Sequence, residues 1–595
     1  MRSRLGPGPV FVYEWLTATR RWQLYAVRAA FVGVILIGMI LVWTSLTRSD
    51  RSGQTVSIQE MARYGEAFYS TVVAVELTLV LLAAPAATAG AVCLDKARGT
   101  LDHILATDLS NAEIVLGKLG VRLAPVLGLV ACVLPITALS GLLGGIDPDA
   151  LFGSFLVAIG CAALGCSLAM ALSVWGRKTH EVLMMTYLIL ILWLSFPMLV
   201  ILVALSLGLP FPRFPLPILW EWLLCTNPYY LAFAPYSDPG KVGMMTYLGF
   251  LGVCLFFSGL VAGLATLRIR GVALKQAGQP AGGPRRSRSA LALPRWRWLP
   301  QLPGPSLEDN PVLWREWHRS KPSRFLRLAW LLYAGLGVLW IVLALRIVNS
   351  GHRGDDEMIA AMNVFQVAVG LLLVSVSAAT SLAEERVRGS LDVLLSTPLS
   401  TRTILAGKWW GAFRQVLHIL IWPAVTTAFL IAGSGRVIAY LGLLALIAAY
   451  GAGITSLGLA LATWVSRLGR AVALCVVAYV VFSIGWVVLI FLVSVVGRLA
   501  PNDHLILPLI MGSPLYGTLF ATLAASLEPL RMPGGGAEVG VGTFLWILIH
   551  GGAAAALFAA TVASFDRCLG RVSETPGRPV PGSKKKPAAE LELEL

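Results

Sequence analysis

The chain has 595 residues, of which 57% are hydrophobic and only 13% are Asp, Glu, Lys or Arg. Soluble domains contain about 25% charged residues, and apolar stretches long enough to cross a hydrocarbon layer about 30 Å thick recur along this sequence. The composition excludes a water-soluble globule and predicts a polytopic membrane protein. The formal charge of +16 does not favour nucleic-acid binding, because the basic residues fall in alternate short loops, where they orient a membrane protein.

The apolar runs predict about twelve transmembrane helices in two sets of six, and therefore an all-α fold. The first set lies near 29–46, 71–93, 121–142, 151–174, 181–207 and 244–267. The second set lies near 328–346, 360–382, 413–432, 437–463, 471–496 and 541–565. The distribution of basic residues favours cytoplasmic locations for both termini. We expect a multi-pass protein of the cell membrane, with a bacterial inner membrane as its location.

A basic linker rich in Pro and Gly divides the two sets. We predict a first six-helix half at 1–270, this cytoplasmic linker at 271–308, a second six-helix half at 309–571 and a disordered cytoplasmic tail at 572–595. The linker and the tail have compositions that do not bury a core.

One segment of the sequence occurs twice. DKARGTLDHILATDLSNAEIVLGK at 95–118 aligns without gaps on ERVRGSLDVLLSTPLSTRTILAGK at 385–408, and eleven of the 24 positions are identical. Weaker matches flank it, with Glu14-Trp15 against Glu316-Trp317 and Asn227-Pro228 against Ser513-Pro514. Because each half has an even number of spans, both halves begin on the same side of the membrane. This internal repeat is therefore parallel, with a pseudo-twofold axis along the membrane normal.

Apolar residues recur at helical spacing within each copy and predict a short amphipathic helix between the second and third spans. The residues on its apolar face are Ala97, Leu101, Ile104 and Leu105, matched by Val387, Leu391, Leu394 and Leu395. Ser110 with Glu113 predicts a capping box that starts the third span. An amphipathic helix of this kind either covers lipid or provides a docking surface. Its repetition, polar identities included, favours docking.

These residues resemble the cytoplasmic motif of type-2 ABC (ABC-2) exporter permeases. The pattern E/D-x-x-R-G-T/S-L-D-x-L-L-x-T-P-L-S ends in G-K before the third span, and N-P-V-x-x-R-E before the first span is also similar to that family. The resemblance covers both halves and implies two permease half-units fused in one chain. It also implies that the amphipathic segment is a coupling helix that contacts the ATPase. The implied residues are Arg98, Gly99, Thr100, Leu101 and Asp102, with Arg388, Gly389, Ser390, Leu391 and Asp392.

The first copy departs from the family pattern at two positions. Asp108 stands where the second copy has Pro398, and Gly8 stands where the second copy has Asn310. We therefore expect the two copies to dock unequally.

The sequence lacks a phosphate-binding loop of the form G-x-x-x-x-G-K-[ST], since Lys118 is followed by Leu119 and Lys408 by Trp409. We expect that the chain is not an enzyme and holds no cofactor, and that partner ABC ATPase subunits, in two copies, bind ATP and Mg²⁺. No metal is expected either, because no further ligand stands at metal-binding spacing from His418 or His550.

Glu76 in the second span and Gln366 at the equivalent position of the eighth are the candidate pathway residues. A carboxylate near hydrocarbon is costly unless it faces a polar cavity or partner. The two residues either line the outer end of a path between the halves or snorkel to water at the interface.

The predicted function is that of the membrane-spanning permease subunit of an ATP-driven exporter. Its partners are a separate ATPase and membrane lipids, and the few charges within its spans suit a hydrophobic or amphipathic substrate. The alternative is a secondary transporter of six plus six helices driven by an ion gradient.

Overall fold

The computed structural model describes residues 8–20, 22–49, 58–141, 146–176, 178–206, 217–238, 240–277, 306–308, 310–318, 324–350, 355–387, 389–431, 436–487, 489–490, 506–526 and 536–569. Within these ranges every element is a helix and no strand occurs, so the all-α prediction is confirmed. Most of the predicted linker, the predicted tail and Arg388 lie outside them.

The helices of the first half, in chain order, are α1 (Pro9–Thr19), α2 (Trp22–Ser49), α3 (Ile58–Thr88), α4 (Gly90–Arg98), α5 (Thr100–Leu105), α6 (Asn111–Gly141), α7 (Pro148–Trp175), α8 (Thr179–Ser206), α9 (Pro217–Cys225), α10 (Pro228–Ser237) and α11 (Met244–Ala277). The last of these continues past the predicted boundary at 270.

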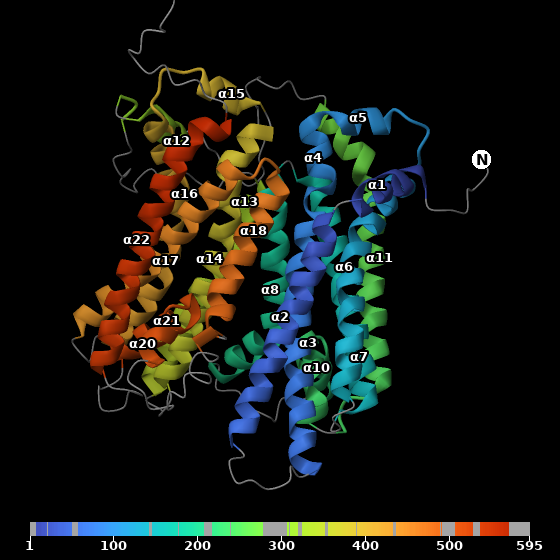
Figure 1. Cartoon of the computed structure of the whole chain (residues 1–595), viewed down its shortest axis with the longest axis vertical. Helices are drawn as coiled ribbons and strands as arrows, with labels where there is room; N and C mark the ends of the chain where they lie inside the picture. Colours follow the sequence, from blue (N-terminus) through green and yellow to red (C-terminus); the bar gives the residue numbers. More distant parts are fainter. Residues whose placement is uncertain are drawn as a thin grey trace, which may run out of the picture.

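The second half repeats this order. Its elements are α12 (Pro311–His318), α13 (Arg324–Ser350), α14 (Asp355–Val387), α15 (Ser390–Leu395), α16 (Thr401–Ile431), α17 (Val437–Trp464), α18 (Leu468–Val480), the π-helix η1 (Val481–Gly485), α20 (Ile506–Ile510), α21 (Pro514–Ser526) and α22 (Gly536–Leu569). Figure 1 shows the two halves side by side, with the long helices running the same way.

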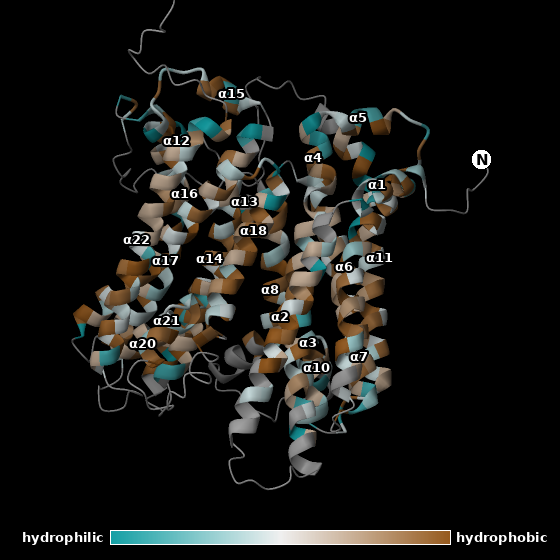
Figure 2. Cartoon of the chain, viewed as in Figure 1, coloured by the Kyte–Doolittle hydropathy of each residue, from teal (hydrophilic) through white to brown (hydrophobic). Residues whose placement is uncertain are grey.

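Eleven helices of the described chain are long and apolar enough to cross a membrane. The remaining predicted span, at 29–46, falls in α2, whose described apolar stretch is Arg28–Ile40. Apolar residues follow the long helices between the two ends of the bundle, and polar residues gather at the ends (Figure 2). The structure therefore agrees with a multi-pass membrane protein.

Small residues set the close packing inside each half. A Cβ atom added to Gly165 of α7 would lie 3.1 Å from the Cβ of Ala84 in α3. In the second half, a Cβ atom on Gly458 of α17 would lie 2.7 Å from the Cβ of Ala378 in α14. The fourth span thus lies directly on the second span in both halves, as expected where small side chains let helix backbones approach.

The second span differs between the halves. In the first half it is interrupted at Ala89, between α3 and α4, and Pro85 lies just before the interruption. The freed backbone N–H groups of Val92 and Cys93 both donate to Ser173 Oγ at 3.0 Å. In the second half α14 is continuous, and Ser375 stands where the first half has Pro85. Proline removes a helical hydrogen bond and favours such a break.

Broken helices follow the fifth span at the end of the bundle opposite α5 and α15 (Figure 1). In the first half Asn227 begins α10, because its Oδ1 accepts from the backbone N–H of Tyr229 at 2.9 Å and Pro228 occupies the first turn. In the second half Ser513 precedes Pro514 at the start of α21, and its Oγ accepts from Leu515 N at 3.3 Å. The match between these two dipeptides is thus a shared helix start.

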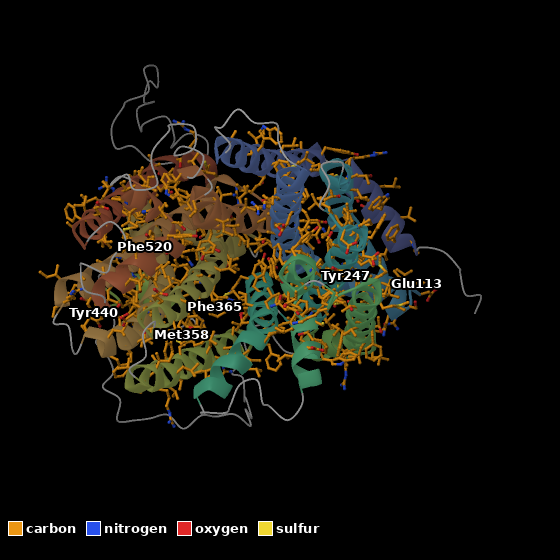
Figure 3. The ribbon with its side chains drawn as sticks, turned by 90° about the horizontal axis from the view of Figure 1, so that it is seen from below. Glu113, Tyr247, Met358, Phe365, Tyr440 and Phe520 are labelled. Carbon is orange, nitrogen blue, oxygen red and sulfur yellow. The ribbon has the colours of Figure 1, made fainter. Side chains whose placement is uncertain are left out.

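The two halves meet through the fifth span of each half, which packs on the first or second span of the other half. α8 of the first half packs along α13 and α14, while α18 of the second half touches α3. Seen from below, Tyr247 and Glu113 lie in one half, and Tyr440 and Phe520 lie in the other (Figure 3).

Candidate functional site

The two predicted coupling segments lie at the same end of the molecule. Figure 1 places α5 and α15 there, beside α1 and α12, the short helices that lead into the first span of each half. A parallel repeat requires this arrangement, because the two copies are related by an axis along the bundle.

Each coupling segment is a turn followed by a short helix, and not the single amphipathic helix predicted from the sequence. The second span continues as helix to Arg98 or Val387 and then ends at a glycine in the left-handed region, with φ of 74° at Gly99 and 71° at Gly389. A new helix of six residues follows in each half. Ala97 is therefore exposed at the end of α4 and does not share the apolar face of α5.

The apolar face of each short helix packs on the chain itself. Leu101 is buried in a cluster with residues of α6, α7 and α11, including Ile114 and Ile269. Leu391 and Leu394 are buried in the large cluster of the second half. These faces therefore do not cover lipid, and the opposite faces are left free.

The polar residues of both segments project outward. Arg98, Gly99, Thr100 and Asp102 are exposed, as are Gly389 and Asp392, whereas Ser390 is partly exposed. The predicted set thus divides into outward-facing residues and the inward-facing anchors Leu101 and Leu391. Arg388 lies outside the described residues.

A buried lysine lies beneath each segment. Lys118 Nζ of α6 is 2.6 Å from Glu14 Oε1 of α1 and 2.7 Å from Asp95 Oδ2 of α4, and the lysine side chain is only 4% exposed. Arg122 approaches Glu14 at 3.5 Å. This group joins two cations to two anions, so its formal charge is balanced.

The second half contains the same arrangement. Lys408 Nζ of α16 lies 2.5 Å from Glu316 Oε1 of α12 and 2.7 Å from Glu385 Oε1 of α14, with its side chain 3% exposed. Arg315 contacts Glu385 at 3.2 Å. We call these two groups the lysine clusters. We call α1 and α12, the short helices before the first span of each half, the leading helices. Each lysine cluster joins the leading helix of its half to the end of the second span and the start of the third span.

The glycine before each lysine lets the leading helix approach. A Cβ atom on Gly117 would lie 3.3 Å from the backbone nitrogen of Phe11, and one on Gly407 would lie 2.9 Å from that of Leu313. The Gly-Lys pair at the end of the repeated motif therefore has a structural role, in which glycine makes room and lysine forms the ion pairs.

Glu14 and Glu316, noted in the sequence only as part of the flanking match, pair with the buried lysines in the structure. The signal was present in the sequence. Lys118 and Lys408 are identical in the repeat, Asp95 and Glu385 are both acidic, and Glu14 and Glu316 match in the flanking segment. A lysine repeated at the start of an apolar span requires an acidic partner, and the repeat narrows the candidates to these residues and the Asp102/Asp392 pair, which the structure leaves exposed.

Comparison with known families bears on the half that contains Lys408. Residues 327–567 match the family described as ABC-2 family transporter protein. This region is an ABC-2 transporter domain. The family is the membrane component of ABC transporters and lacks the nucleotide-binding domain. The match supports a membrane transporter permease of the ABC type and gives no support to a secondary transporter. No curated protein matches the chain.

The ABC-2 domain and the first half differ around their leading helices. Asn310 caps α12, since its Oδ1 accepts from Leu313 N at 3.0 Å, and its amide donates to Thr403 O at 3.0 Å. Gly8 has no side chain and begins α1 through its backbone carbonyl alone, which accepts from Phe11 N. The predicted capping box of the first half is confirmed, with Glu113 N donating to Ser110 Oγ at 3.2 Å and Ser110 N to Glu113 Oε2 at 2.8 Å.

Glu76 and its counterpart Gln366 in the ABC-2 domain are both buried, so snorkelling to water is wrong. Glu76 lies two helical turns from Tyr69, whose hydroxyl donates to carbonyls of α7 and α10 at 3.0 and 3.1 Å. Gln366 Nε2 donates to Tyr333 O of α13 at 3.4 Å. Tyr333, the hydrogen-bond partner of Gln366, belongs to the same half as Gln366. A position between the halves therefore gains no support, and a pathway role stays a prediction.

Across the part of the chain that the structure describes, no three His, Cys, Asp or Glu side chains come together in a group able to hold a metal ion.

Proposed function

We propose that the chain is the membrane subunit of an ATP-driven exporter, in which two cytoplasmic ABC ATPase subunits dock on α5 and α15. The ATPases hold ATP and Mg²⁺, and this chain holds no nucleotide or other cofactor and is not itself an enzyme. The end bearing α5 and α15 then faces the cytoplasm, with both termini on that side of a bacterial inner membrane. The substrate is hydrophobic or amphipathic.

The observation that supports this proposal most directly is the pair of short helices at one end of the molecule, each anchored by a buried leucine and each presenting an acidic residue outward. Asp102 and Asp392 occupy identical places in the two copies. Two equivalent exposed surfaces suit a partner with two equivalent subunits.

The lysine clusters connect the ends of the second spans, next to the docking helices α5 and α15, to the third spans, so that movement of docked ATPases reaches the membrane-spanning helices. A displacement of α5 moves the end of α4, and Asp95 on α4 is joined through Lys118 to α6 and α1. Breaking a buried ion pair is costly, so these elements move together. Closure of the ATPases would thus act on the second and third spans of both halves at once.

The test is to purify the tagged full chain from its native membranes and to measure the bound ABC ATPase by mass spectrometry and by Mg²⁺-dependent ATP hydrolysis. We expect Asp102→Arg combined with Asp392→Arg to reduce the bound ATPase about ten-fold, because charge reversal at the centre of an interface is costly. Leu101 and Leu391 are unsuitable probes, because their side chains are buried and their replacement would unseat the helices.

Asp149→Arg is the matched control, since Asp149 is an exposed acidic residue at the first turn of α7. It should leave the bound ATPase unchanged. Full retention of the ATPase by the double variant would overturn docking on α5 and α15.

A further inference from the structure

Each half has an outer helix whose capping residue also contacts the fifth span. The outer helices are α10 and α21, which lie at the end of the bundle opposite α5 and α15 (Figure 1). In the first half Asn227 Nδ2 donates to the backbone carbonyl of Leu194 in α8 at 2.9 Å. In the second half Ser513 Oγ donates to the backbone carbonyl of Ser483 in η1 at 2.5 Å. We call these two hydrogen bonds the outer latches.

The two latches occupy equivalent positions. Leu194 lies 15 residues after the first residue of α8, and Ser483 lies 15 residues after the first residue of α18. The donors are equivalent too, because Asn227 and Ser513 each stand directly before the proline that begins the outer helix. An amide supplies the donor in one half and a hydroxyl in the other. The latch is therefore a shared feature of both halves and does not depend on one residue type.

Both fifth spans are irregular next to the acceptor. In α8, Pro197 has no N–H, so the carbonyl of Trp193, next to Leu194, loses its usual helical donor. In the second half Ser483 lies within η1, where the backbone hydrogen bonds depart from the α-helical spacing. Backbone groups released within a membrane need new partners, which side chains of neighbouring helices supply. Each latch thus joins an outer helix to a region of the fifth span where helical bonding is disturbed.

The outer helices are also attached to the second span of their own half. Tyr229 OH of α10 lies 2.9 Å from Thr78 Oγ1 of α3, and α21 packs along α14. Tyr69 OH of α3 donates to Ala232 O of α10 at 3.1 Å. The fifth spans in turn touch the other half, since α8 packs on α13 and α14, and α18 touches α3. Each latch therefore connects the second span, whose inner end carries the coupling segment, to the span that meets the other half.

The segment before Ser513 has further restraints. Three aromatic side chains donate to backbone carbonyls of residues 508–511, namely Tyr450, Trp486 and Trp546. Among the described residues, no side-chain hydrogen bond from another helix reaches residues 217–226, which precede Asn227. Loss of a single latch should therefore have the larger effect at Asn227.

We propose that Asn227 and Ser513 are positioning residues of an outer gate. While both latches are formed, α10 and α21 stay against the fifth spans and the outer end of the molecule is closed. The outer end opens when the latches release. The inference rests on the proposed function, because ATPase-driven movement of the second spans releases the latches. The competing role is helix capping alone, in which the contact between Asn227 and Leu194 has no effect on opening.

Asn227→Asp separates the latch from the cap. Aspartate keeps the oxygen that accepts from Tyr229 N and caps a helix as well as asparagine does, but it has no N–H for Leu194 O. Hydrogen exchange across α10 in the purified full chain should therefore be about five-fold faster. Asn227→Ser, which copies the second half, should keep exchange slow. Thr226→Ala is the matched control, because Thr226 is exposed and its hydroxyl donates to Leu223 O within its own helix.

The native thiol of Cys225 reports opening in the complex with the copurified ATPase. Cys225 is partly buried and lies close to Asn227 in the sequence, whereas the exposed Cys568 lies near the end of α22, at the opposite end of the bundle. In right-side-out vesicles, a membrane-impermeant maleimide should label Cys225 faster after addition of Mg²⁺-ATP and vanadate. In the Asn227→Asp chain, labelling should already be fast without nucleotide. Mass spectrometry of the labelled peptides identifies the thiol.

Two results would each overturn the proposal. Normal exchange in Asn227→Asp would mean that Asn227 only caps its helix. Equal labelling of the unaltered chain with and without nucleotide would mean that the outer end does not open at the latch. The exchange measurement uses no ATPase, so loss of docking on α5 and α15 leaves it unaffected. Conversely, normal exchange in a variant that still binds the ATPase would reject the latches and leave docking intact.

Discussion

Lys408 and Glu385 form an ion pair, with 2.7 Å between Nζ and Oε1, at the point where the second and third spans of the ABC-2 domain meet. Lys118 and Asp95 repeat this pair at 2.7 Å in the first half. An interaction preserved in both copies, although the paired acid changes from Glu to Asp, indicates that the charge pairing itself is required.

Replacing Lys408 with Met leaves Glu316 and Glu385 close together without their shared cation. We expect a loss of about 3 kcal/mol in the free energy of unfolding, the lower end for breaking a buried pair, because both carboxylates keep some access to water. Unfolding of the purified chain in detergent, followed by tryptophan fluorescence, measures it. Adding Glu316→Gln and Glu385→Gln to the Lys408→Met chain should recover part of the loss. A triple variant no better than the single one would contradict an electrostatic origin.

Gly407→Ala should loosen α12 more than Gly117→Ala loosens α1. The added methyl group would meet Leu313 N and Val312 Cβ at 2.9 Å in the second half, whereas in the first half the nearest atom is at 3.3 Å. We expect overpacking of about 1–3 kcal/mol at Gly407 and a smaller effect at Gly117. Protease cleavage near each leading helix reports its detachment. Equal cleavage of the two variants would show that these close contacts do not hold the leading helices.

Glu76→Gln should leave the chain at least as stable as before. Both carboxylate oxygens of Glu76 are buried and accept no hydrogen bond from the described residues, and glutamine is already present at the equivalent Gln366. A buried charge without a partner is costly, whereas the neutral amide is less so. The reciprocal Gln366→Glu should lower the unfolding temperature. If Glu76→Gln were the damaging change, Glu76 would have an ionic partner outside the described residues.

Gly389→Ala should destabilise the turn before α15. At a φ of 71° an added Cβ atom is strained even though no atom lies within 4 Å, so we expect a cost of about 1 kcal/mol. Hydrogen exchange of the amides from Ser390 to Leu395 should accelerate accordingly. Gly252→Ala in α11 is the control, because that glycine is helical with open space around it, and there alanine should be neutral or stabilising.

Composition and periodicity were sufficient for the all-α class and for the order of the spans, because apolar runs of this length have few alternatives in a membrane. The duplicated segment was also readable, since identities at fixed spacing place both copies on the same side. The break at Gly99 was missed because the apolar spacing from Ala97 to Leu105 fits one continuous helix. Only the backbone conformation of the glycine reveals two.

The repeat offered candidate partners for Lys118 and Lys408 but did not show which of them pair, for a different reason. Each cluster joins residues from three helices, and Glu14 lies 104 residues from the lysine that it contacts. Helical periodicity describes the face of one element and does not say which faces meet.

Because the second span is interrupted between α3 and α4 but continuous in α14, we expect the second spans of the two halves to differ in bending stiffness. Because α14 is a continuous helix, a rotation of its end at Val387 should also rotate its other end at Asp355. We expect the second span of the first half to bend more readily near Ala89, because Pro85 removes one helical hydrogen bond just before it. An equal displacement of α5 and α15 should therefore tilt the second half as a unit. In the first half it should bend the second span only near α4.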